Sequence, residues 1–200
     1  MRLRETAFRL PAGPEDGRPV PMPALYGALA ADEARDALIV TDVLAALAAG
    51  RHPVVLTERR DHLERLRGRL AGSVPNLVVL RGGMGAGERR AADAAMRAGD
   101  GACLVLATGR YLGEGFDDPR LDTLFLTLPI SWKGTLAQYV GRLHREHEGK
   151  SEVVVHDYVD TAVPVLTRMA AKRQVGYRSL GYIIEALGRD PLAAVPGAAA

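Results

Sequence analysis

Two arginines and a glutamine near position 140 have the types and spacing that phosphate chemistry requires. Gln138, Arg142 and Arg145 stand at i, i+4 and i+7 of a segment with helical periodicity, with Gly141 between them, so they would form one stripe on a helix. Guanidinium groups stabilise the charge that spreads over a transferring phosphoryl group. Nearby arginines repel one another, and glycine costs a helix about 1 kcal/mol relative to alanine. The stripe therefore predicts the close approach of a phosphate, and a solvated basic face is the alternative.

Small and polar residues also gather where three short apolar runs end. They are Thr57 and Arg59 at the first run, Gly82 and Gly83 after the second, and Thr108 and Gly109 after the third. Ligands of open α/β sheets bind beyond the carboxyl ends of the strands, so these residues are candidates for contacts with a nucleic-acid backbone. The segment 81–88 does not match G-x-G-x-x-G, and an ordinary glycine-rich turn is its alternative interpretation.

The elements that would position these residues form a regular alternation. Five short apolar runs alternate with helix-periodic segments, and they span residues 52–57, 76–80, 102–107, 121–128 and 151–159. The runs are continuously apolar, which is typical of strands buried on both faces of a parallel sheet. We therefore predict a three-layer α/β sandwich, with an open, mostly parallel sheet and helices on both faces.

The chain length corresponds to about one domain, since it has 200 residues. The first 25 residues are rich in proline and glycine and predict a linker with little regular structure. We expect the domain over 26–188 and a flexible tail over 189–200. Within the domain, a helix is expected from Asp32, as its cap, to Gly50, and a long helical stretch over 162–187.

The composition excludes several classes of protein. The net charge is +2, too small to indicate a polyanion partner by itself, and the single cysteine, Cys103, excludes a disulfide framework. No apolar run reaches the length of a membrane span. The five histidines show no metal-ligand spacing, so we expect no metal site. The charges in MRLRE stand where a signal peptide needs apolar residues, so we expect a cytoplasmic protein.

Four segments together resemble a known family of motors. QYVGRLHR (138–145) resembles motif VI of superfamily-two helicases, and ATGRYLGEGFDDPRLDTLFL (107–126) resembles motif V. VVLTERRDHLERL (54–66) resembles motif IV, and VVLRGGMGAGERR (78–90) is similar to the nucleic-acid-contacting turn that follows it. In order and context, the segments are similar to the second RecA-like domain of DEAD/DEAH-type helicases, of the bacterial restriction or conflict-system kind.

The resemblance implies a role for each candidate residue. Arg145 would be the arginine finger that reaches the γ-phosphate of ATP, with Arg142 as its companion. The residues implied beside the nucleotide are Gln138, Gly141, Gly115 and Asp117. The residues implied on the nucleic-acid track are Thr57, Arg59, Gly82, Gly83, Thr108 and Gly109. The distance from Thr108 to Asp117 is one residue longer than is usual in motif V, and a simple turn before Pro119 is the alternative for Asp117.

The sequence contains neither a Walker A loop nor the Asp-Glu pair that holds Mg²⁺. Gly149-Lys150-Ser151 resembles the end of a P-loop, but His144 stands where the motif needs glycine, and a strand follows. The resemblance therefore implies a domain that binds ATP with Mg²⁺ only together with the first RecA-like domain of the same protein, and that is inactive alone. It favours DNA over RNA as the track. A non-catalytic nucleic-acid-binding or partner-binding module is the alternative, and a Rossmann-type enzyme is a third possibility.

Overall fold

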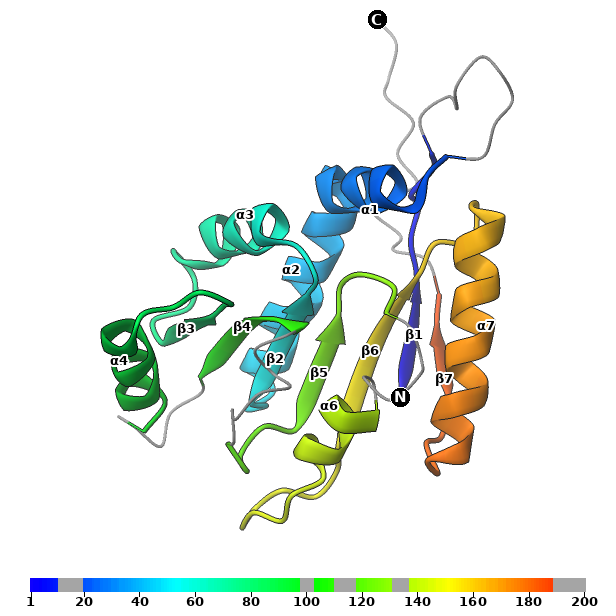
Figure 1. Cartoon of the computed structure of the whole chain (residues 1–200). Coiled ribbons are helices and arrows are strands. Elements are labelled where there is room, and N and C mark those ends of the chain that lie inside the picture. The colour runs from blue at the N-terminus through cyan, green and yellow to red at the C-terminus, as the bar shows by residue number, and fades with distance from the viewer. Residues whose placement is uncertain (11–19, 98–102, 110–117, 131–136, 189–200) are drawn as a thin grey trace, which may run out of the picture.

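The chain folds around one parallel β-sheet. We analysed a computed structural model, which describes residues 1–10, 20–97, 103–109, 118–130 and 137–188. In these ranges, seven strands follow the order β3-β4-β2-β5-β6-β1-β7, and every pair is parallel (Figure 1). The strands are β1 (Arg2–Glu5), β2 (Pro53–Thr57), β3 (Leu77–Leu80), β4 (Leu104–Thr108), β5 (Thr123–Leu126), β6 (Val154–Val159) and β7 (Glu185–Leu187). Five of them occupy the five predicted apolar runs, which confirms the parallel sheet.

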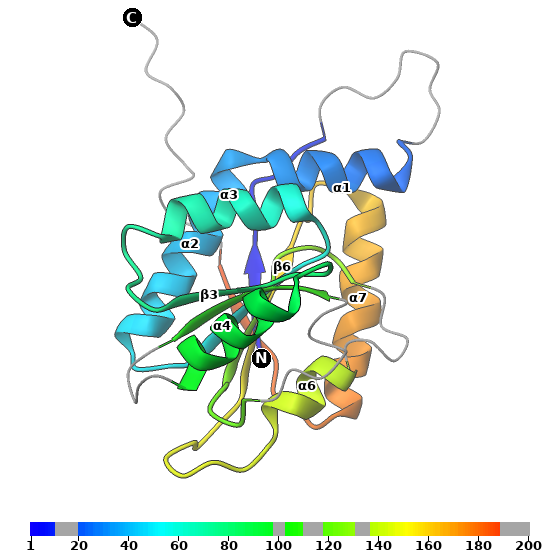
Figure 2. The same cartoon turned by 60° about the vertical axis from the view of Figure 1, so that its left-hand side comes forward.

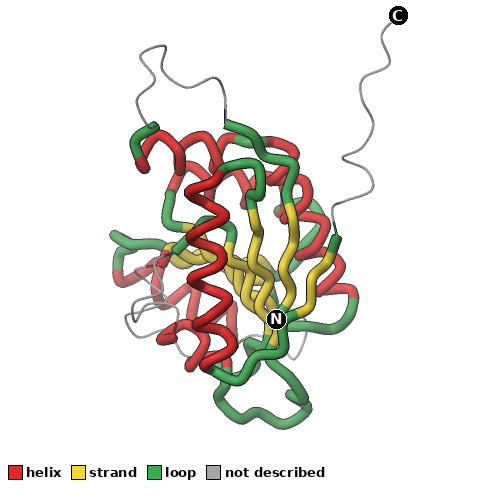
Figure 3. Tube along the Cα trace, turned by 90° about the vertical axis from the view of Figure 1, so that its right-hand side faces the viewer, coloured by secondary structure: helices red, strands yellow, loops and turns green. Residues whose placement is uncertain are grey.

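Helices cover both faces of the sheet (Figure 2, Figure 3). They are α1 (Met22–Ala31), α2 (Glu33–Ala48), α3 (Arg60–Leu70), α4 (Ala86–Arg97), α6 (Ala137–Leu143) and α7 (Pro164–Ser179). On one face α2 and α3 pack on Val55, Leu106 and Phe125. On the other, α4, α6 and α7 contribute to a core that contains Val54 and Leu56. Neighbouring residues of β2 thus point into different cores, which is why the strand is apolar throughout and which confirms the three-layer sandwich.

The helix α1 lies across the edge where the strands end, above β5 and β6 in Figure 1. Its buried residues Leu25 and Leu29 form a third cluster with Phe8, Leu128 and Leu166, which come from segments that follow β1 and β5 and from α7. The next helix, α2, begins as predicted, because Asp32 Oδ1 accepts a hydrogen bond of 2.7 Å from the Arg35 amide.

The structure departs from the predicted linker at the N-terminus. Residues 2–5 form β1, which pairs with β6 on one side and β7 on the other, and α1 begins at Met22. The strand is only four residues long, and two of them are arginines, so the pattern RLRE does not look like a buried strand. Its partners β6 and β7 lie far away in the sequence, and pairing with them makes these residues a strand.

The second departure lies at the other end of the domain. The predicted helical stretch over 162–187 is α7, which ends at Ser179, followed by a turn and the strand β7. Gly181 has a φ of +83°, a conformation that favours glycine and allows the chain to reverse. No helix in the described ranges is long and apolar enough to cross a membrane.

Candidate functional site

The carboxyl ends of β3, β4 and β2 lie side by side and bring together three of the predicted track segments. Thr57 of β2 and Thr108 of β4 are partners in the strand register. The Gly82 amide, just beyond β3, donates a hydrogen bond of 3.3 Å to Thr108 Oγ1. Residues that are up to 51 positions apart in sequence, from 57 to 108, thus meet at one edge of the sheet, as the fold class predicts.

The hydroxyl of Thr57 points into the protein. Its Oγ1 lies 3.0 Å from Nδ1 of His62, whose Nε2 lies 2.9 Å from Asp36 Oδ1, and all three residues are buried. The hydroxyl also accepts a hydrogen bond of 3.3 Å from the Arg59 amide. Burial lowers the pKa of His62, and the hydrogen bond to Asp36 opposes this shift without reversing it. The Thr57 hydroxyl is therefore occupied inside the fold, where it fixes the start of the segment that leads to Arg59.

Two arginines follow this threonine and differ in what they bind. The guanidinium of Arg59, 35% exposed, is paired with Asp61 at 2.6 and 3.0 Å. Arg60, which was not among the predicted track residues, donates to the carbonyl of Gly82. Gly83 has a φ of +81°, and a β-carbon there would lie 2.9 Å from Arg60 Nη2. The glycine turn is thus held in place by a side chain from α3, and Gly83 is needed for its conformation.

Gly109 lies where β4 meets α6. Its carbonyl accepts a hydrogen bond of 2.6 Å from the hydroxyl of Tyr139. A β-carbon at Gly109 would lie 2.8 Å from that hydroxyl and would overlap the carboxylate of Glu58. Burial, together with the negative charge of Glu58, raises the pKa of Tyr139 to about 12, and burial raises the pKa of Glu58. The glycine therefore permits a close contact between the strand edge and the helix that carries the candidate arginines.

The helix α6 has a buried side and an exposed side, as predicted. Tyr139, Val140 and Leu143 are buried against the sheet, whereas Gln138 and Gly141 are exposed and Arg142 is partly exposed. The predicted stripe thus faces away from the core for the residues within the helix.

Arg145 does not lie on this helix, contrary to our expectation. The helix ends at Leu143, and the Arg145 amide reaches the Arg142 carbonyl only at 3.5 Å. The Arg145 carbonyl instead accepts a hydrogen bond of 3.0 Å from Nζ of Lys150, which draws the backbone into the following loop. Arg145 is exposed in that loop.

Of the remaining candidates, Gly115 and Asp117 lie outside the described residues. The neighbouring Asp118 is described, and it binds Arg120 through both carboxylate oxygens, at 3.0 and 2.8 Å, and also accepts from the Arg120 amide. Burial opposes ionisation of Asp118, but these hydrogen bonds outweigh it and lower its pKa. Asp118 therefore stabilises the turn that contains Pro119.

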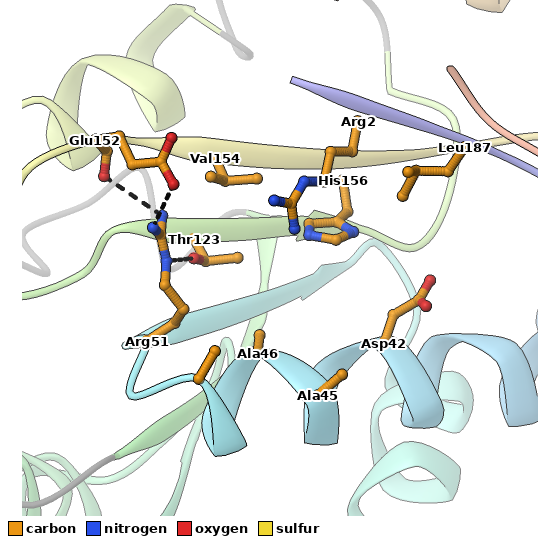
Figure 4. A pocket seen from close by; sticks show the side chains of 11 residues that line it. Arg2, Asp42, Ala45, Ala46, Arg51, Thr123, Glu152, Val154, His156 and Leu187 are labelled. Carbon is orange, nitrogen blue, oxygen red and sulfur yellow. Dashed lines mark hydrogen bonds and ion pairs between the residues drawn. The ribbon is translucent and has the colours of Figure 1, made fainter. Parts of the chain in front are cut away.

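A cavity of about 370 Å³ lies elsewhere, between α2 and the strands β5, β6 and β1 (Figure 4). Asp42, Ala45 and Ala46 line it from α2, and Arg51 at its margin is bound to Thr123 and to Glu152. His156 lines it and stacks on Phe125, with ring centroids 4.4 Å apart. None of the candidate residues lines this cavity, so the candidate site is the carboxyl edge with α6.

No family model matches the sequence, and no curated protein matches it. Solved structures do match. T4 UvsW superimposes with a TM-score of 0.72 at 14% identity, over 94% of this chain and 41% of that one. S. cerevisiae Dbp5 bound to RNA and ADP BeF3 gives a TM-score of 0.57 at 13% identity, over 78% of this chain and 38% of that one. The C-terminal domain of the DEAD-box protein Dbp5 gives 0.55 at 15% identity, over 76% of this chain and 84% of that one.

The present chain spans about two fifths of the length of the first two of these structures. Of the isolated C-terminal domain of Dbp5, 84% is covered, which locates the likeness to that protein in its C-terminal domain. At such low identities the likeness concerns the fold. The chain shares the RecA-like α/β fold of these structures.

Proposed function

We propose that this chain is the second motor domain of an ATP-dependent nucleic-acid helicase or translocase. The observation that carries the proposal is the meeting of the strand-end edge with α6 through Tyr139 and Gly109. One side of this contact holds Thr108 and the glycine turn, and the other holds Gln138, Gly141 and Arg142. A RecA-like fold that joins a candidate track to a candidate phosphate-binding helix suits a motor.

In this proposal ATP with Mg²⁺ binds between the chain and a first RecA-like domain of the same protein. The exposed side of α6 suits a polyanion, because the helix contains no acidic residue and its stripe leaves Gln138 and Arg142 accessible. Arg142 and Arg145 would contact the phosphates, and Gln138 would lie beside the nucleotide. The first domain would supply the Walker A loop and the Mg²⁺ ligands, which the present sequence lacks.

The chemistry assigned to Arg145 is stabilisation of charge. The γ-phosphoryl oxygens share negative charge in the transition state, and a guanidinium placed there lowers the barrier without exchanging a proton. Closure of the two domains would bring Arg145 to the phosphate and change the contacts that the chain makes with the nucleic acid. The exposed position of Arg145 in the loop after α6 suits a group that would meet ATP only when the domains close.

The track would consist of the Gly82-Gly83 turn with Arg59, Thr108 and Gly109. Dbp5 has been solved with RNA. For this chain we propose DNA, in a cytoplasmic protein of the bacterial restriction or conflict-system kind, on the resemblance of its motifs alone. Comparing stimulation of ATP hydrolysis by single-stranded DNA and by RNA of the same sequence tests this choice.

The decisive experiment is Arg145→Ala in the protein that contains both motor domains. We expect hydrolysis to fall by about 10³-fold or more, while binding of ATP changes only a few-fold, because the finger acts mainly in the transition state. Exposed Arg69 on α3 provides the matched control, and Arg69→Ala should leave both unchanged.

Three results would contradict the proposal. Equal loss of binding and hydrolysis in Arg145→Ala would make Arg145 a ground-state ligand and not a finger. Rapid DNA-stimulated hydrolysis by the present chain alone would show that it needs no first domain. If nucleic acid bound but ATP hydrolysis did not respond to it in the two-domain protein, a non-catalytic binding module would be the better description.

A further inference from the structure

Two side chains from the α6 region bind backbone carbonyls on either side of residues 110–117. Tyr139 Oη donates to the carbonyl of Gly109, at 2.6 Å. Lys150 Nζ donates to the carbonyl of Pro119, at 3.0 Å, and to that of Arg145, also at 3.0 Å. Both flanks of the β4–β5 connection are therefore fastened to the segment that carries the candidate arginines.

The first fastening is a buried one. Tyr139 is 3% exposed, and the absence of a side chain at Gly109 lets the hydroxyl reach the carbonyl. Since burial raises the pKa of Tyr139 to about 12, the hydroxyl keeps its proton at neutral pH and remains a donor. Thr108, the residue before Gly109, accepts a hydrogen bond from the Gly82 amide. A continuous path thus runs from α6 to the glycine turn.

The second fastening uses the lysine of the P-loop lookalike Gly149-Lys150-Ser151. Its ammonium group binds two carbonyls of this chain. Burial lowers the pKa of Lys150, and the nearby carboxylates of Asp122 and Asp118 oppose that shift. Hydrogen bonds from a charged donor are about twice as strong as neutral ones. Lys150 therefore holds the backbone of Arg145 against the turn at Pro119.

We propose that Tyr139 and Lys150 are positioning residues that hold Gly109 and Pro119, the described flanks of the β4–β5 connection, to the segment that carries the candidate arginines. Tyr139 transmits a shift of the track to α6, and Lys150 sets where Arg145 lies when the domains close. This inference rests on the proposed function, because it assigns how the nucleotide contacts and the track move together.

The test uses the two-domain protein with matched pairs of variants. Tyr139→Phe removes one hydroxyl, and its control is Tyr26→Phe, which removes a hydroxyl bound to the Pro129 carbonyl at 2.9 Å, near the same edge. Lys150→Met removes the ammonium group, and its control is Lys172→Met at an exposed site on α7. The readouts are kcat and KM for ATP with and without single-stranded DNA, and the thermal midpoint.

The two variants should lower different kinetic quantities, the stimulation by DNA in one case and kcat in the other. Tyr139→Phe should lower the ratio of DNA-stimulated to basal rate by about 3- to 10-fold, the effect of one hydrogen bond. Lys150→Met should lower kcat by about 10-fold with KM for ATP within about twofold, because the amine acts through Arg145. Lys150→Arg keeps a charged donor and should recover most of kcat.

The outcomes separate this inference from the proposed function. Rates equal to those of the controls, or losses that follow a drop in thermal midpoint and are not rescued by Lys150→Arg, would overturn the positioning roles while leaving the motor intact. An unsubstituted two-domain protein that no nucleic acid stimulates would overturn the proposed function, and this inference with it.

Discussion

At the scale of the residue, His156 is a titratable group kept neutral by its surroundings. It is 5% exposed, and its ring stacks on Phe125. Burial, reinforced by the positive charges of Arg2, Arg4 and Arg51, lowers the pKa of His156 to about 3. The folded protein therefore does not take up a proton on this ring in mild acid, whereas the unfolded chain does so below pH about 6.5.

This difference predicts a pH dependence of stability with a definite sign. Because the unfolded state binds the extra proton, stability should fall as pH decreases from 6.5, by roughly 2 kcal/mol between pH 6.5 and 5. Urea unfolding at several pH values measures the slope, and His156→Phe, which keeps a ring on Phe125, should flatten it by that amount. The other histidines are present in both proteins, so their contributions cancel in the comparison. An unchanged slope in the variant would show that His156 is not the group responsible.

At the scale of the element, α2 is anchored at its first turn to the ends of three strands. The buried guanidinium of Arg35 donates through Nε to Asp160 Oδ1 at 3.0 Å and also to the Thr127 carbonyl. Asp160 accepts a further hydrogen bond of 2.6 Å from the hydroxyl of Thr6. These partners follow β6, β5 and β1, so one ion pair sets where the helix starts relative to the carboxyl edge.

Removing one partner of the Arg35–Asp160 ion pair should strongly lower the free energy of unfolding, because the other partner remains as an unpaired buried charge. We expect Arg35→Met to lower the free energy of unfolding by about 3–5 kcal/mol. Adding Asp160→Asn should restore part of that loss, since the unpaired charge is then gone. Chemical denaturation of the single and double variants gives the coupling, with Glu33→Gln on the exposed side of α2 as the control. Strictly additive losses would mean that the two residues stabilise the fold separately.

At the scale of the whole molecule, β1 joins parts of the sheet that would otherwise not meet. In the described part of the chain it is the strand neighbour of both β6 and β7. Leu3, at its centre, pairs with Asp157 on one side and Ala186 on the other. The integrity of this side of the sheet therefore depends on four residues that come first in the sequence.

Leu3→Pro tests this dependence. Proline removes a backbone donor and is not tolerated inside a sheet with strands on both sides. We expect a loss of about 3 kcal/mol or more in the free energy of unfolding, with the amides of β7 losing protection from hydrogen exchange before those of β2. Leu3→Val keeps the donor and the apolar contact and should cost about 1 kcal/mol. Equal protection of β7 in the proline variant would contradict the role given to β1.

The strands β2 to β6 were predictable because each occupies a short, continuously apolar run, which is typical of strands in a parallel sheet covered on both faces. The strand β1 was not, because its stabilisation comes from partners about 150 and 180 residues away and not from its own side chains. The end of α6 also depends on tertiary structure, since Lys150 binds the Arg145 carbonyl outside the helix.

Within the candidate site, the strand-end residues and the exposed side of α6 followed from strand order and helical spacing. What the sequence could not indicate is which polar groups satisfy one another inside the protein. The Thr57 hydroxyl has the residue type of a phosphate ligand, yet it is bound by buried His62. Tyr139 has the position of a core residue, yet its hydroxyl holds Gly109. Only the spatial arrangement separates these roles.

The place of β1 in the sheet has a consequence for how the protein is made. The strand β1 cannot pair with β6 until β6 has been synthesised, roughly 150 residues later. At about 5–20 residues per second this is a wait of roughly 8 to 30 seconds. During that time the segment that will form β1 is an unpaired peptide, and two of its four residues are arginines. The two arginines that hide the strand from sequence analysis are also charges that oppose its aggregation in the meantime.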